Sequence, residues 1–97
     1  MKIETSVDRI LLSGTLYLQD LEVLVAKLTQ QIHSENKVIY ISLSEIEDMD
    51  TAALQVFVAA RTMAHNLQKQ IKITALNTIA RQAFTLSGLD ALFPLPL

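Results

Sequence analysis

The sequence contains no cysteine, no tryptophan, two glycines and two prolines among its 97 residues. Without cysteine, the chain has no disulfide, no thiolate nucleophile and no thiolate ligand for a metal. The scarcity of glycine and proline predicts few irregular loops. Hydrophobic residues make up 51% of the sequence, which favours a globular chain over a disordered one. Residues 1–97 are therefore expected to form one domain.

The sequence also has no apolar run of about 18 residues, the length that a membrane-spanning helix needs. Its first residues carry an acid, Glu4, and no apolar stretch of signal-peptide length. We therefore expect a cytoplasmic protein without direct membrane insertion. The eight lysines and arginines are scattered and the formal net charge is −2, so the chain shows no basic footprint for nucleic acid.

Hydrophobic periodicity in the first half predicts a strand pair followed by a helix. Strands are expected over 2–6 and 9–13, with Gly14 ending the hairpin. Asp20 is expected to cap the following helix at its N-terminus. One face of that helix should turn inward because its apolar residues recur at helical spacing. These residues are Leu21, Leu24, Val25, Leu28 and Ile32.

The second half predicts two strands and two helices. Residues 38–43 form a continuous apolar run, which is typical of a strand buried on both faces. An acidic loop over 44–49 and the longest helix, 51–69, should follow. Residues 71–76 alternate as a strand nearer an edge does, and Asn77 should cap the last helix.

The predicted order is therefore β-β-α-β-α-β-α, an α/β fold with a mixed sheet and helices packed against it. The strands at 38–43 and 71–76 are joined by a helix and should be parallel. Gly88 stands where a glycine that follows a helix belongs. The apolar tail 92–97 either packs back on the domain or mediates pairing, which leaves the oligomeric state open.

No motif in the sequence indicates catalysis. His33 and His65 are not spaced with an acid as a triad or a metal pair would be, so both are expected to be solvated. Four carboxylates cluster in six residues, but their spacing does not match a calcium loop. We expect no enzyme activity, no cofactor and no metal site. The clustered carboxylates are Glu45, Glu47, Asp48 and Asp50.

The most informative pair is Asp50-Thr51, at the start of the longest predicted helix. A helix start carries unpaired N–H groups and a partial positive charge, so it needs a cap and also favours a phosphate. If Asp50 is the cap, Thr51 is the first helical residue and its hydroxyl points outward, accessible to a kinase. A phosphate there would add about −1.5 to −2 charges and change the surface more than the fold. Capping alone is the simpler explanation of the pair.

The helix face around Thr51 is unusually apolar for a solvent-facing stripe, because Leu54 and Val58 share it. One interpretation is that Leu54 tucks under the acidic loop and Val58 is an ordinary surface residue. The other is a docking ridge for a protein partner, with the hydroxyl at its edge. The candidate partner-binding residues are Asp50, Thr51, Leu54, Gln55, Val58 and Arg61.

Three stretches at matching spacing resemble a STAS domain, the module shared by sulfate transporters and anti-sigma-factor antagonists. They are Leu12-Ser13-Gly14, the strand 39–44 with the following 49–54, and the closing stretch 79–89 with its Ser-Gly-Leu end. The resemblance covers almost the whole chain. Tyr17 stands where many antagonists have an acid.

In the antagonist branch, the resemblance implies that Thr51 is phosphorylated by an anti-sigma-factor serine/threonine kinase and dephosphorylated by a phosphatase. The unmodified form binds the kinase and frees a sigma factor, which regulates transcription. Other stand-alone STAS proteins are subunits of lipid-transport ATPase complexes or accompany chemotaxis and two-component proteins. A small-ligand or nucleotide-binding module is a further alternative, although the sequence has no glycine-rich phosphate loop.

Overall fold

The computed structural model describes residues 1–96, and its strands and helices follow one another in the predicted order. Two short 3₁₀ turns, Leu18–Asp20 and Leu89–Ala91, were not predicted. The main elements are β1 (Lys2–Thr5), β2 (Arg9–Leu16), α1 (Leu21–Ile32), β3 (Val38–Met49), α2 (Thr51–Asn66), β4 (Gln70–Leu76) and α3 (Thr78–Leu86).

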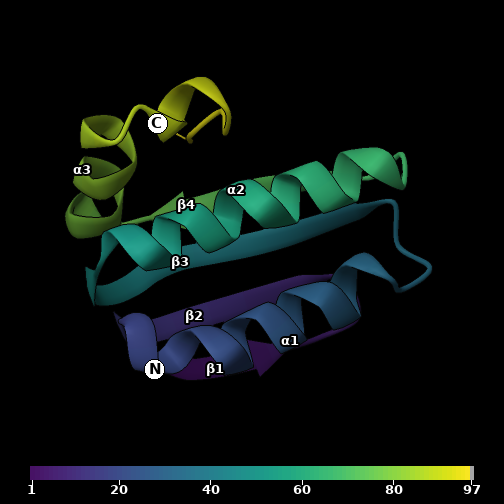
Figure 1. Cartoon of the computed structure of the whole chain (residues 1–97), viewed down its shortest axis with the longest axis horizontal. Coiled ribbons are helices and arrows are strands. Elements are labelled where there is room, and N and C mark those ends of the chain that lie inside the picture. Colours follow the sequence, from purple (N-terminus) through teal and green to yellow (C-terminus); the bar gives the residue numbers. More distant parts are fainter. Residues whose placement is uncertain (97) are drawn as a thin grey trace.

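The four strands form one mixed sheet in the order β1-β2-β3-β4. β1 is antiparallel to β2, whereas β2, β3 and β4 run parallel to one another. The predicted parallel crossover from β3 to β4 is confirmed, and α1 makes a second crossover from β2 to β3. Figure 1 shows α1 and α2 side by side in front of the sheet and α3 at one end of it.

The core lies between the sheet and its helices. Alternate residues of β2 and β3 point toward the helices and are buried, as in a sheet with one covered face. α2 meets them with Phe57 and with short alanines, which let the helix approach the sheet closely. Three buried aromatic rings then connect α2, α3 and the C-terminal segment. Phe57 and Phe84 are 5.9 Å apart between centroids, and Phe84 and Phe93 are 5.8 Å apart.

The opposite face of the sheet is open, so the prediction that β3 is buried on both faces was wrong. Ile39, Ile41 and Leu43 are buried, but Tyr40 and Ser42 between them point to the open face and are half-buried. The run looked continuous because tyrosine is partly apolar. β3 therefore follows the alternation of a strand with one solvated face.

The predicted acidic loop is also wrong, because β3 continues through it to Met49. β2 likewise continues past Gly14 to Leu16, where Ser13 pairs with Glu45 and Leu16 with Met49. Register irregularities interrupt the pairing, and Gly14 adopts a φ of 81° beside one of them. Such bulges break the strict alternation on which strand prediction rests.

Of the two N-terminal caps predicted for α1 and α3, only the cap of α3 is confirmed. The side chain of Asn77 caps α3 by accepting a hydrogen bond from the Ala80 amide at 3.0 Å, as predicted. Asp20 does not cap α1 with its side chain, because its carboxylate accepts from the Tyr17 amide at 2.9 Å. Gly88 follows α3 with a φ of 79°, as a residue after a helix often does.

Val25, which its spacing placed on the inward face of α1, is instead exposed, and so are two other large apolar residues, Leu67 and Ile79. α2 ends at Asn66 and not at 69, so Leu67 lies beyond it. Val25 lines a groove between α1 and α2.

The C-terminal segment packs back on the domain. Phe93 is buried, Arg61 donates through Nε to the Leu92 carbonyl at 3.0 Å, and Arg81 donates to the Pro96 carbonyl. The first of the two roles expected for the tail is therefore confirmed as far as Pro96. Leu97 lies outside the described residues.

Candidate functional site

The start of α2 is held by Asp50, whose two carboxylate oxygens bind two different segments. Oδ1 accepts from the Ala53 amide at 3.0 Å and so caps the helix. Oδ2 accepts from the Leu18 amide at 3.0 Å, which ties the 3₁₀ turn after β2 to the same point. Thr51 is the first residue of the helix and is exposed. Because Asp50 supplies the cap, the fold does not need the Thr51 hydroxyl for this purpose.

Beside this helix start, the carboxylates of Glu47, Asp48 and Asp50 form an acidic edge around Tyr17. The Tyr17 hydroxyl donates to Asp48 Oδ2 at 2.7 Å. This hydrogen bond raises the pKa of Tyr17 most, and burial and the negative charges of Asp48, Asp50 and Glu47 raise it further. Each of these effects disfavours the phenolate. Tyr17 therefore remains a neutral donor on an otherwise acidic edge.

The raised pKa of Tyr17 gives a pH-dependent prediction. The pKa of Tyr17 in the folded protein lies above the usual value of about 10. The neutral hydroxyl and its hydrogen bond to Asp48 therefore stabilise the fold fully below about pH 10. This stabilisation is lost as pH rises through the folded-state pKa. Asp48→Asn should move the absorbance change that marks ionisation of Tyr17 to lower pH. Tyr17→Phe is the reference, because it leaves only the signal of Tyr40. Asp90→Asn, on the second 3₁₀ turn, is the control and should leave the transition in place. An unmoved transition in Asp48→Asn would contradict this assignment.

The outer stripe of α2 is less exposed than the docking-ridge interpretation requires. Leu54 is only 5% exposed and belongs to the core, which agrees with the interpretation that it tucks inward and not with the docking ridge. Val58 is half-buried against the core, and Arg61 is half-buried with its Nε on the Leu92 carbonyl. Among the six candidate residues, Thr51 and Gln55 are the two classed as exposed. Whether any of the six contacts a partner stays a prediction.

Two leucines that the sequence did not single out lie near Thr51 with most of their surface in solvent. Leu18, on the 3₁₀ turn tied to Asp50, is 71% exposed. Leu86, at the end of α3, is 88% exposed. Leu86 comes two residues after the buried Phe84, so helical spacing places it off the core face of α3. This spacing is the sequence signal from which its exposure could have been predicted. A hollow lies between α2 and α3, and the residues that line it are Met49, Asp50, Thr51, Leu54, Gln55, Ala83, Leu86 and Ser87.

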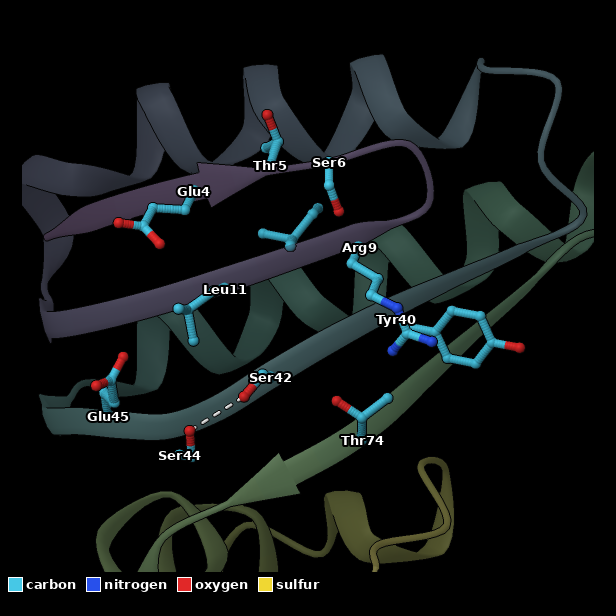
Figure 2. A pocket seen from close by; sticks show the side chains of 11 residues that line it. Glu4, Thr5, Ser6, Arg9, Leu11, Tyr40, Ser42, Ser44, Glu45 and Thr74 are labelled. Carbon is cyan, nitrogen blue, oxygen red and sulfur yellow. Dashed lines mark hydrogen bonds between the residues drawn. The ribbon is translucent and has the colours of Figure 1, made fainter.

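A second hollow, of about 630 Å³, lies on the open face of the sheet (Figure 2). The Arg9 guanidinium sits 4.6 Å from the centroid of the Tyr40 ring, a cation–π contact. Glu4 and Glu45 also line the hollow, so one arginine is outweighed by two carboxylates. This balance does not favour the phosphates of a nucleotide.

Over residues 1–96, no group of three or more histidine, aspartate or glutamate side chains is placed to hold a metal ion. Within the same range, no helix combines the length and the apolar character needed to cross a bilayer. His33 and His65 are both exposed, as predicted.

Residues 2–95 match the profile of a family described as "Mlab, STAS domain", so the chain belongs to the STAS domain family. Its fold is similar to that of an anti-sigma factor antagonist from Mycobacterium paratuberculosis. That similarity has a TM-score of 0.75 at 19% identity over 97% of this chain and 81% of the other.

Unphosphorylated SpoIIAA, also an anti-sigma factor antagonist, gives a TM-score of 0.76 at 17% identity, over 95% and 84% of the two chains. The crystal structure of Mglu gives a TM-score of 0.63 at 14% identity, over 80% of this chain and 20% of that one. At these identities the likeness establishes the fold. No curated protein sequence matches the chain.

Proposed function

We propose that this STAS protein is a single-domain cytoplasmic regulator that acts by binding a protein, in the manner of an anti-sigma factor antagonist, and catalyses no reaction. Phosphorylation of Thr51 switches the binding. The partners are an anti-sigma factor with serine/threonine kinase activity and a phosphatase that removes the phosphate. One observation carries this proposal: at the start of α2, Asp50 caps the helix, so that Thr51 is exposed and its hydroxyl is not needed as a cap.

The electrostatics of the helix start suit a switch that acts on the surface. The helix dipole would stabilise a phosphate on Thr51 by about 0.3–1 kcal/mol, while Asp48 and Asp50 would repel it. These opposing effects leave the fold nearly unchanged. A partner that covers Leu18 or Leu86 would, however, have to desolvate about two extra negative charges on phosphorylated Thr51. Its affinity should therefore fall sharply.

Thr51→Glu should weaken partner binding at least tenfold, whereas Thr51→Ala should bind within about twofold of the unmodified protein. The partner is obtained by pull-down from the native host, with and without phosphatase treatment, and its affinity is measured by calorimetry. Thr74→Glu is the matched control because Thr74 is also an exposed threonine but lies on β4, where it lines the hollow on the open face of the sheet. No phosphate on Thr51 after incubation with the cognate kinase, together with equal binding by Thr51→Glu, would refute the switch.

A constitutive subunit is the second candidate, of a lipid-transport ATPase or of a chemotaxis or two-component complex. The large exposure of Leu18 and Leu86 favours it, because large apolar side chains exposed near the same helix start suit a permanent contact. It predicts a complex that co-purifies without phosphate. In that case Thr51→Ala should weaken the complex as well as Thr51→Glu, since Thr51 would be a contact residue.

A further inference from the structure

An apolar groove of about 230 Å³ lies between α1 and α2 and opens to solvent. Of the residues that line it, only Thr29 and Gln55 are polar and none is charged. On the α2 side, the short side chain of Ala59 leaves room for the groove. Val25 faces the groove, which explains why a residue with core periodicity is 45% exposed. The main lining residues are Val25, Leu28, Ile32, Val56, Ala59 and Met63.

The lining of the groove selects an apolar and uncharged occupant. Water is held in a cavity by two to four polar partners, which this groove offers only at Thr29 and Gln55. An apolar cavity of about 150 Å³ takes up benzene, so this groove has room for one or two large apolar side chains. A lipid is disfavoured because no lysine or arginine lines the groove to bind an anionic headgroup.

The groove is continuous with the surface around Thr51. Gln55 lines both the groove and the hollow beside Thr51, one helical turn away. A stable protein interface buries about 800 Å² on each partner, and its centre is apolar and poor in charge. The groove has this character, whereas the acidic edge at Asp48 suits the polar rim. A partner centred between Thr51 and Met63 would cover both features.

The shape of the groove points to a helix as the partner element. α1 and α2 lie side by side (Figure 1), and the lining of the groove extends from Val25 to Ile32 on α1 and from Gln55 to Met63 on α2. Its α2 wall runs from Gln55 to Met63, about 12 Å or two helical turns. We propose that the groove between α1 and α2 is the second half of the partner surface and binds an amphipathic helix of the protein partner. This proposal rests on the proposed function, because it takes the partner to be a protein that also covers Thr51. Apolar side chains spaced three or four residues apart on that helix enter the groove.

Indole provides a direct test of the groove, because it mimics one large apolar side chain. Titration of the intact protein with indole should shift the backbone amide resonances of Val25, Ala59 and Met63. Ala59→Trp should abolish the shifts, since the new ring fills the groove from its rim. Shifts confined to other regions, or none up to the solubility of indole, would overturn the proposal whether or not a partner is in hand.

Two exposed valines of α1 provide a matched pair for partner binding. Val25 lines the groove, whereas Val23, at 53% exposure, is not among its lining residues. Val25→Glu should weaken binding of the partner recovered in the Thr51 pull-down at least tenfold, and Val23→Glu should leave it within about twofold. Equal effects of the two variants would overturn the proposal. Both variants should keep the thermal unfolding midpoint of the parent, because both side chains are already exposed.

The two proposals fail in different ways. If Thr51→Glu abolishes binding and Val25→Glu does not, the groove is not part of the partner surface, while the switch stands. If Val25→Glu abolishes binding and both Thr51 variants bind normally, the groove is confirmed and the switch is wrong. Adsorption of the protein to phosphatidylglycerol vesicles that Val25→Glu abolishes would identify a lipid surface as the occupant and overturn the partner helix.

Discussion

Phe84→Ala is expected to lower the free energy of unfolding by about 3–5 kcal/mol, the range for removal of a large buried aromatic side chain. Phe84 is buried, and its ring lies between Phe57 of α2 and Phe93 of the C-terminal segment. Its removal therefore leaves a cavity where three segments meet. Aromatic pairs add about 0.5–1.5 kcal/mol beyond their buried area, so the loss of two pairs places the effect high in this range.

Urea unfolding followed by circular dichroism measures this loss. Phe84→Leu is the control, because it keeps most of the volume and should cost clearly less than the alanine variant. Destabilisation by less than about 1 kcal/mol in Phe84→Ala would show that the C-terminal segment does not depend on the aromatic cluster. Protection of the Phe93 amide from hydrogen exchange should fall with the global stability in the same variant.

The element order could be predicted because each element carries its own periodic signal. Leu24, Leu28 and Ile32 recur at helical spacing in α1, and all three are buried. The parallel pairing of β3 and β4 followed from the helix between them, since a crossover of that length joins parallel strands. Asn77 could be assigned as a cap from its position alone, because capping is a local interaction.

The ends of β2 and β3 could not be predicted in the same way. The stretch from Ser44 to Met49 is rich in acids, and strand propensity opposes that composition. It extends because it pairs with the end of β2, some 30 residues away, across two register irregularities. Ile46 and Met49 are buried at a spacing of three, which no strict strand alternation contains. The tertiary partner decides the structure here.

In the candidate site, too, local features could be predicted, whereas features formed between elements could not. Asp50 and Thr51 were placed correctly at the helix start, because a cap and the residue after it are local features. Leu18 and Leu86 were missed because they come from two other elements that approach α2 only in the folded chain. The groove between α1 and α2 was missed for the same reason. The sequence gives the faces of each helix, but not the gap that remains when two helices pack.

Leu54 provides a decisive comparison between a core residue and a docking residue. Because Leu54 is 5% exposed and part of the core, Leu54→Ala should lower the free energy of unfolding by about 2–3 kcal/mol. Gln55→Ala, at the next and exposed position, is the control and should change it by no more than about 0.5 kcal/mol. Urea denaturation measures both values.

Partner affinity, measured well below the unfolding midpoint, completes the comparison. Leu54→Ala should then bind nearly as tightly as the parent, because a side chain that supports the helix from inside offers little surface to a partner. The opposite pattern, with unchanged stability and a binding loss of tenfold or more, would show that Leu54 turns outward in solution. The apolar stripe of α2 would then be a docking ridge, and the groove beside it would not be needed to explain how the partner is held.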